Sequence, residues 1–376
     1  MRLARSTTLP ELFDAVGDTP VVRLRNLTAA HEAELVVKLE GANPGGSLKD
    51  RPASHIIRHA ERTGALRPGG TIIESSSGNF GIALAMFGAS RGYRVIAVVD
   101  PKLTATNRAL LRAFGAEIIV VDEQDDSGSY HKTRIFLANQ LHRQIAGSFR
   151  PDQCFNPLNS EAHLRSTAAE LLDQAGPELA AVVCTVSTGG HLGGIARSVK
   201  QRAPHVRVIG VDVDGSTVFG GRPHAYLTPG VGLSWTPVNL DDLSLVDEVY
   251  KVTDEDAYRA CRTLARTEGI LAGVSTGAAL TVALAAAMRT PAGRRVAVLA
   301  SDRGERYLNT AFDDEWLRAN TLTTECTAAG LRARAGRLTP YSTDPAADCG
   351  NYLPQLAEQL DSPTARQPRA NAEVGR

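Results

Sequence analysis

Short apolar runs rich in β-branched residues alternate with longer stretches of helical periodicity along most of the chain. The short runs predict buried strands at Leu35–Leu39, Thr71–Ile73, Val95–Val99, Ile118–Val121, Ala181–Val186, Val206–Val211 and Val296–Leu299. The longer stretches predict helices at Pro52–Thr63, Phe80–Arg91, Thr104–Phe114, Tyr130–His142, Glu161–Gln174 and Asp254–Thr267. Thr253 and Asp256 have the spacing of a capping box for the last of these helices. The alternation predicts an α/β protein whose parallel strands are covered by helices on both faces.

Length and charge narrow this picture further. The 376 residues suffice for two or three structural units. The 41 Lys and Arg residues balance 41 Asp and Glu residues, which argues against a broad basic surface for nucleic acid. After Trp316 the chain becomes rich in Ala, Arg, Thr and Pro, and its last segment, SPTARQPRANAEVGR, predicts a disordered tail.

The cysteines and the N-terminus indicate a cytoplasmic protein. The five cysteines are scattered and none forms a C-x-x-C pair, so a zinc ribbon is not supported and reduced thiols are expected. The N-terminus has no apolar signal-peptide core, and no apolar run is long enough to span a membrane. His55 and His59 have a spacing that can bind a metal, but without a neighbouring carboxylate or thiol we expect a solvated helix face and no metal.

Two loops between predicted strands and helices have the composition of anion sites. Small side chains in Glu74-Ser75-Ser76-Ser77-Gly78-Asn79 leave backbone N–H groups accessible to a carboxylate, although simple N-capping by one serine would explain them too. The loop S-T-G-G-H-L-G-G, residues 187–194, favours a single phosphate. It matches neither G-x-G-x-x-G nor G-x-x-x-x-G-K-[ST], which disfavours a dinucleotide or an ATP loop.

A third loop and a lysine complete the candidate chemistry. Residues 272–278 precede an apolar helix up to Met288, and a tight turn with a Ser or Thr cap would also explain them. The segment N-P-G-G-S-L-K-D-R-P places Lys49 directly before a predicted helix. A lysine held away from water can lose its proton and attack a carbonyl. Most lysines are merely exposed, but the phosphate loop favours a nucleophile here.

In their order along the chain, these motifs resemble those of the cysteine synthase/cystathionine β-synthase family. They are N-P-G-G-S-L-K-D-R-P, S-S-S-G-N, S-T-G-G-H, P-G-V-G, G-V-S-T-G and D-R-G-E-R-Y-L. The resemblance runs from about Phe13 to about Trp316, with Asp18 where the family's G-N-T-P motif has Asn. It implies the cofactor pyridoxal 5′-phosphate (PLP) and PLP fold type II, with two interleaved open parallel-sheet domains, as in the tryptophan synthase β-subunit.

The resemblance also implies roles for individual residues. Lys49 would form the Schiff base with PLP, and Asn79 would hydrogen-bond the cofactor's phenolic oxygen. Ser275 would face the pyridine nitrogen, where a neutral hydroxyl favours β-elimination over transamination. The cofactor phosphate would be held by Ser187, Thr188, Gly189, Gly190 and His191. The substrate would be bound by Ser75, Ser76, Ser77, Gly232 and Arg222.

The implied reaction is a β-replacement on an amino acid, with Lys49 as the base at Cα. Within the family, the chain most resembles the branch that joins O-phospho-L-serine to L-glutamate and releases phosphate, on the way to L-2,3-diaminopropionate for a siderophore or peptide antibiotic. The stretches V-V-D-P-K and E-S-S-S-G-N-x-G-I-A-L-A-M carry this resemblance, with Phe80 where ordinary cysteine synthases have Thr. Two alternatives stay open. One is a cysteine synthase that uses sulfide with O-acetylserine or O-phosphoserine, and the other is a non-catalytic ligand-binding homologue.

Phosphoserine and glutamate would bring several negative charges into one cleft, so cationic side chains should line it. The candidates are Arg51, Arg222, His224 and Arg303, each of which could equally form a structural ion pair. Two further expectations concern organisation. We expect a larger PLP-binding domain of residues 1–47 plus 156–318, a smaller mobile substrate domain of residues 48–155, and a largely flexible extension of residues 319–376. The resemblance also implies a homodimer, with small amino acids as its other partners.

Overall fold

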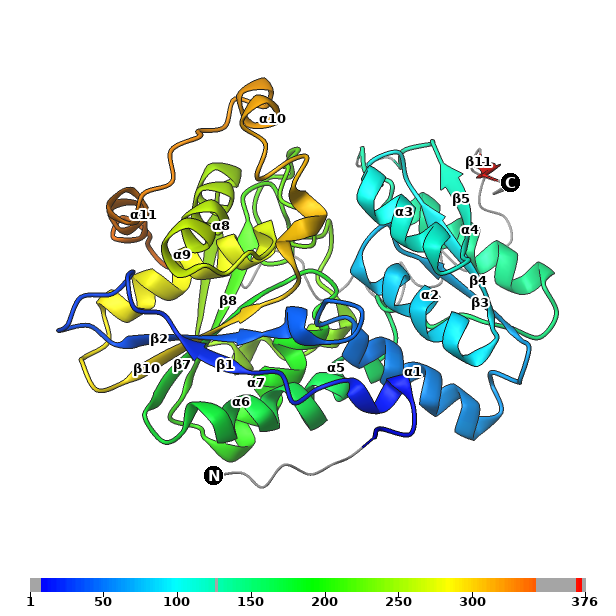
Figure 1. The fold of residues 1–376 in the computed structure, drawn as a ribbon, viewed down its shortest axis with the longest axis horizontal. Coiled ribbons are helices and arrows are strands. Elements are labelled where there is room, and N and C mark those ends of the chain that lie inside the picture. The colour runs from blue at the N-terminus through cyan, green and yellow to red at the C-terminus, as the bar shows by residue number, and fades with distance from the viewer. Residues whose placement is uncertain (1–7, 126–127, 343–369, 374–376) are drawn as a thin grey trace.

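The computed structural model describes residues 8–125, 128–342 and 370–373, and these form two sheets (Figure 1). The larger sheet has the strand order β1 (Val21–Arg23), β2 (Glu34–Leu39), β10 (Arg295–Ala300), β7 (Leu179–Thr185), β8 (Arg207–Val213) and β9 (Glu248–Val252). The smaller sheet has the order β11 (Ala370–Glu373), β5 (Glu117–Val121), β4 (Arg94–Val99), β3 (Thr71–Ser75) and β6 (Ser148–Phe149). Neighbouring strands are parallel except in the pairs β1–β2 and β11–β5.

Helices cover both faces of each sheet. They are α1 (Asp50–Thr63), α2 (Asn79–Arg91), α3 (Ala105–Ala113), α4 (His131–Gln144), α5 (Leu158–Ala162), α6 (Ala168–Ala175), α7 (Gly190–Arg202), α8 (Asp254–Glu268), α9 (Val274–Met288), α10 (Asp314–Ala319) and α11 (Ala328–Ala335). Helices α8 and α9 pack on one face of the larger sheet and α6 and α7 on the other (Figure 1). Helices α1 and α2 bury one face of the smaller sheet and α4 the opposite face. Within the described residues, no helix combines the length and the apolarity that crossing a membrane requires.

The predicted α/β class with parallel sheets is confirmed. All seven predicted strands are present, with ends within two residues of the expected ones. The predicted helix Glu161–Gln174 is wrong as a single element, because a π-helical turn at His163–Thr167 separates α5 from α6. Thr253 does cap α8 by accepting a hydrogen bond from the Asp256 amide at 3.2 Å. The Asp256 carboxylate, however, accepts from the Thr253 hydroxyl and from Arg334 rather than completing a capping box.

The beginning of the predicted C-terminal extension is packed on the core. Helix α11 buries Leu331 and Ala335 against α8 and α9. Arg332 forms an ion pair with the buried Glu32 at 2.7 Å, and Arg334 pairs with Asp256 at 2.6 Å. This part of the chain therefore differs from the flexible segment that the sequence predicts. Most of the predicted disordered tail lies outside the described residues, although residues 370–373 of it form strand β11.

Candidate active site

Lys49 lies where the larger sheet meets helix α1. Leu48 N donates to the carbonyl of Ser301 at 2.8 Å, and Ser47 forms an isolated bridge with Asp302. These bonds fix the lysine loop on the residues that follow strand β10. Gly46 has a φ of +81°, which a residue with a side chain would adopt only at a cost. The turn thus places Lys49 near the carboxyl edge of a parallel sheet, the usual position for ligands in such folds.

The amine of Lys49 loses its proton more easily than that of an exposed lysine. The side chain is half-buried, and among the described residues its Nζ has no hydrogen-bond or ion-pair partner. Burial lowers the pKa of Lys49 to about 8, because an ammonium ion loses hydration away from water, while nearby Cys154 opposes that shift. A large fraction of the amine is therefore unprotonated near pH 8, the form that can act as a nucleophile or base.

The loop Ser187–His191 connects β7 to helix α7. Gly189 has a φ of +79°, and the helix begins at Gly190. The first N–H groups of a helix have no acceptor within it and lie at the positive end of its dipole, which suits an anion. Ser187 Oγ donates to the carbonyl of Gly232 at 3.3 Å, so the P-G-V-G loop lies directly beside this anion site.

Asn159 holds the phosphate loop from the side of helix α5. Its Nδ2 donates to Thr188 Oγ1 at 3.1 Å. A Cβ atom on Gly190 would lie only 2.1 Å from Asn159 Oδ1. Gly190 is therefore required for close packing against Asn159, and the predicted loop is a tightly built unit.

Two buried histidines stand next to Lys49. The rings of His191 and His163 have centroids 6.0 Å apart, and the Nε2 atom of each has no partner among the described residues. Burial lowers the pKa of His191 to about 3, and the charge of Lys49 lowers it further. The imidazole is thus neutral and can hydrogen-bond a ligand. Sequence reasoning missed His163, because a histidine inside a predicted helix cannot be told from a core residue.

The three serines at the end of β3 differ in their hydrogen bonds. Ser76 Oγ accepts from the amide of Gly81 at 3.1 Å, so it serves partly as the helix cap that the sequence left open. Ser77 Oγ accepts from Arg134 Nη1 at 2.8 Å and donates to Asp100 at 3.1 Å.

Arg134 is a cationic residue that sequence reasoning missed. It is buried on α4, with Nη1 at 3.0 Å from Asp100 Oδ2. Burial lowers the pKa of Arg134, while Asp100 and Cys154 raise it. Cys154 thus lies near both Arg134 and Lys49. The only signal in the sequence is the position of this arginine directly before the apolar run Ile135–Ala138.

Asn79 is engaged by residues of the larger-sheet unit. Its Nδ2 donates to Asp302 Oδ2 at 2.7 Å, and its Oδ1 accepts from Arg306. Tyr307 donates to the same Asp302 oxygen at 2.6 Å. The second N–H of the Asn79 amide is the one left for a ligand. These contacts join helix α2 to the turn after β10.

Ser275 lies buried in the first turn of α9. The next residue, Thr276, accepts from the amide of Ser301 at 3.1 Å. A Cβ atom on Gly273 would lie 2.2 Å from Asp302 Oδ1. The Ser275 loop, the Lys49 loop and Asn79 therefore all meet residues 301–302.

Two of the expected substrate cations are structural. Arg51 is buried and pairs with Glu40 and Glu170 at 2.7 Å each. His224 is an exposed partner of Asp214 at 3.3 Å. Neither contacts a predicted cofactor residue among the described residues, so the alternative of an ion pair holds for both.

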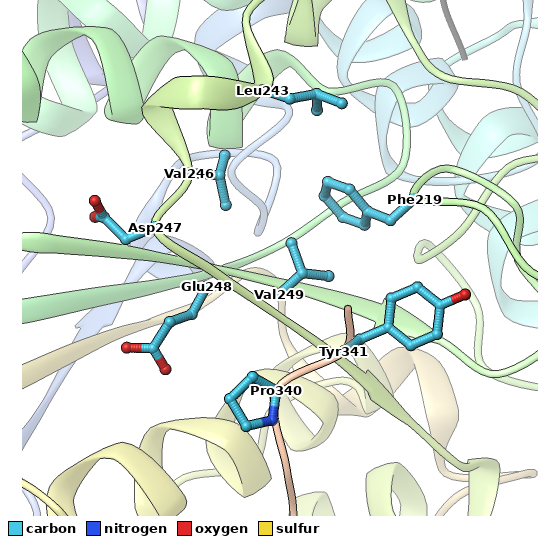
Figure 2. Close-up of a pocket in the computed structure, with 8 residues that line it drawn as sticks. All are labelled: Phe219, Leu243, Val246, Asp247, Glu248, Val249, Pro340 and Tyr341. Carbon is cyan, nitrogen blue, oxygen red and sulfur yellow. The ribbon is translucent and has the colours of Figure 1, made fainter. Parts of the chain in front are cut away.

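The other two expected cations have different surroundings. Arg222 is exposed, and within the described residues it does not contact a predicted cofactor residue. Arg303 lines a cavity of about 330 Å³ beside the lysine loop. A smaller cavity of about 140 Å³ lies elsewhere, where Pro340 and Tyr341 face strand β9 (Figure 2). It contains no described residue that the resemblance implies for PLP.

The site fits PLP on three observations. Within the part of the chain that the structure describes, the amine of Lys49 and the buried Nε2 atom of His191 have no partner, and the amides at the start of α7 could bind an anion. Residues 12–302 match the family described as "Pyridoxal-phosphate dependent enzyme". The chain belongs to this family of PLP-dependent enzymes, and PLP is its cofactor.

Curated and solved relatives refine the placement. The chain is 43% identical over 311 residues to the N-(2-amino-2-carboxyethyl)-L-glutamate synthase of Cupriavidus metallidurans, which covers 81% of this chain and 90% of that protein. It is 42% identical over 308 residues to the enzyme of the same name from Ralstonia nicotianae, with the same coverage. A crystal structure of O-ureido-L-serine synthase superposes with a TM-score of 0.76 at 35% identity, covering 83% of this chain and all of that one.

Proposed function

We propose that the protein joins O-phospho-L-serine to L-glutamate, forming N-(2-amino-2-carboxyethyl)-L-glutamate and phosphate. The observation that carries this proposal is the identity of 42–43% to two synthases of that name over most of both chains. The geometry supports it, because a buried arginine lies beside the serine loop where a phosphorylated donor would need a cation. The reaction is a β-replacement, in which phosphate leaves Cβ and the glutamate amine takes its place.

PLP, when bound, supplies a carbonyl for the substrate amine and withdraws electrons from Cα. In this proposal it would be held by Lys49, by the Ser187–His191 loop and by Asn79, with Ser275 at its ring nitrogen. A neutral hydroxyl there would leave the ring nitrogen unprotonated. The ring would then be a weaker electron sink, which favours departure of a β-leaving group. The expected roles of these residues rest on the resemblance and on their convergence at residues 301–302.

The chain's own residues would carry the proton transfers and binding steps. The neutral Nζ of Lys49 would remove the Cα proton and later return one. Backbone amides of the Ser75–Ser77 loop would bind the substrate carboxylate, with the hydroxyl of Ser75 as a further donor. Closure of the smaller-sheet unit would exclude water from the site. The domain limits at residues 47/48 and 155/156 remain part of this proposal.

Arg134 is the residue that we expect to receive the donor phosphate. It already contacts Ser77, and it shares Cys154 as a neighbour with Lys49. Within the described residues, its ion pair with Asp100 at 3.0 Å and its hydrogen bonds involve Nη1 and Nε, so Nη2 is the nitrogen that we expect to bind an anion. Arg222, an exposed residue, is the weaker candidate on this geometry.

Replacing Arg134 with glutamine is expected to lower kcat/KM for O-phosphoserine about 100-fold, and that for O-acetylserine much less. The reason is that a buried arginine contributes about 2–3 kcal/mol to binding a dianion, but little to binding a neutral ester. Steady-state rates with both donors measure the difference, and Arg94→Gln is the control, since Arg94 is an exposed arginine of the same unit that pairs with Glu117 at 2.6 Å. Equal losses for the two donors would show that Arg134 only supports the fold.

The function itself is tested with the purified holoenzyme and O-phosphoserine. We expect a product with the mass of N-(2-amino-2-carboxyethyl)-L-glutamate when glutamate is supplied, with release of one phosphate per turnover. Sulfide is supplied in a parallel reaction. Cysteine formation with sulfide and no product with glutamate would favour the cysteine synthase alternative. Absence of bound PLP and of either product would favour a ligand-binding homologue.

Three finer features complete the proposal. We expect a homodimer, which the resemblance implies and which sedimentation would measure. We also expect a cytoplasmic enzyme, since its scattered cysteines suit a reducing compartment. Its product would be consumed by an oxidative step toward L-2,3-diaminopropionate, for a siderophore or a peptide antibiotic.

A further inference from the structure

A cavity of about 330 Å³ lies beside the lysine loop. One wall is formed by Gly45 and Gly46, which precede Lys49 by four and three residues. The opposite wall is formed by helices α2 and α3 of the smaller-sheet unit. The volume is in the range of small-molecule sites. The cavity thus lies between the two units and against the loop that carries Lys49.

The charged side chains of this cavity favour an anion. Arg303 and Arg306 both line it, and neither forms an ion pair within the described residues. Arg303 Nε donates only to the carbonyl of Gly41 at 2.6 Å, which leaves both of its terminal nitrogens available. Glu305 is the one carboxylate in the lining formed by described residues. The lining therefore carries a net positive charge.

The rest of the lining favours a short aliphatic chain. Ile82, Leu110 and Phe114 present apolar side chains from α2, from α3 and from the residue that ends α3. A ligand with methylene groups would contact these residues while a carboxylate reached an arginine. Arg306 also donates to Asn79 Oδ1, so the cavity adjoins the proposed cofactor site directly.

We propose that this cavity binds the nucleophilic amino acid, with Arg303 receiving a carboxylate and the apolar wall contacting its methylene groups. The inference rests on the proposed function, in which that amino acid is L-glutamate. Arg303 would then determine which nucleophile is accepted, whereas Arg134 would serve the phosphorylated donor. The two substrates would have separate cations.

The test compares Arg303→Gln and Arg303→Lys with wild-type holoenzyme. We expect Arg303→Gln to raise KM for glutamate about tenfold, because one charge-assisted hydrogen bond is lost. The change in KM for O-phosphoserine should be much smaller, and Arg303→Lys should recover part of the loss. Arg202→Gln is the control, since Arg202 is exposed on α7 and pairs there with Asp173 at 3.2 Å.

Two results would overturn the inference. An unchanged KM for glutamate in Arg303→Gln would show that the cavity is not used. A rise confined to O-phosphoserine would assign Arg303 to the donor. Binding of glutamate to the holoenzyme, measured by calorimetry, separates this inference from the proposed function. Arg303-dependent binding without product would leave the inference standing and end the proposed function, while neither binding nor product would end both.

Discussion

Lys49→Ala is expected to lower the rate of β-replacement by a factor on the order of 10³ or more, because one amine serves as both nucleophile and base. The structure offers no substitute, since among the described residues no second lysine is placed on the loops that meet at Ser301 and Asp302. The purified variant should also lose the visible absorbance of lysine-bound PLP. Steady-state rates and an absorption spectrum of the purified protein measure both effects.

The matched control for this prediction is Lys200→Ala. Lys200 pairs with Asp247 at 2.6 Å on the far end of helix α7, away from the site. We expect it to keep its colour and rate. If Lys49→Ala kept both as well, Lys49 would be an ordinary half-buried lysine and the proposed chemistry would be wrong.

Gly190→Ala is expected to raise the Kd for PLP at least about tenfold and to lower the free energy of unfolding by about 1–3 kcal/mol. The new methyl group would lie 2.1 Å from Asn159 Oδ1, so Asn159 must move and release Thr188. This movement would displace the phosphate loop where Gly190 packs against Asn159. Absorbance titration with PLP and thermal unfolding of the PLP-free protein measure the two effects.

Gly336→Ala is the control for that substitution. Gly336 has a φ of −63°, and its nearest neighbour to a new Cβ atom would be at 3.4 Å, an ordinary contact. We therefore expect wild-type PLP affinity and nearly unchanged stability. A Gly190→Ala protein that bound PLP as tightly as wild type would show that the loop tolerates a side chain and does not closely contact the phosphate.

The strands could be predicted from the sequence, and so could the positions of the strand-to-helix loops that we propose as ligand sites, because both depend on local patterns. β-Branched runs indicate the strands, and small residues between strand and helix indicate the loops. The two contacts that connect the site over long distances were not predictable in this way. Asn79 and Asp302 are 223 residues apart, and Ser77 and Arg134 are 57 apart. The first pair follows from how the two units pack and the second from how α4 packs beside β3, and a single sequence carries no signal of either.

Irregular local structure explains a further failure. The helical periodicity of residues 161–174 is continuous, but the backbone widens into a π-turn at His163. A π-turn has no distinct hydrophobic period, and such turns often occur at functional sites. The turn places His163 beside His191, where a regular helix was expected. Glycine positions are better indicators, since Gly189 and Gly190 of the S-T-G-G-H motif both lie where an added Cβ atom would clash.

Helix α11 contributes to the stability of the part of the chain that matches the family. The family match stops at residue 302, yet Arg332 reaches back across 300 residues to Glu32, whose pKa it lowers chiefly through its hydrogen bond. Without α11, Glu32 would lose the cation that pairs with it. The apolar surface of α8 and α9 that Leu331 covers would also be exposed to water. A chain that ended before α11 is therefore expected to be less stable than the full chain.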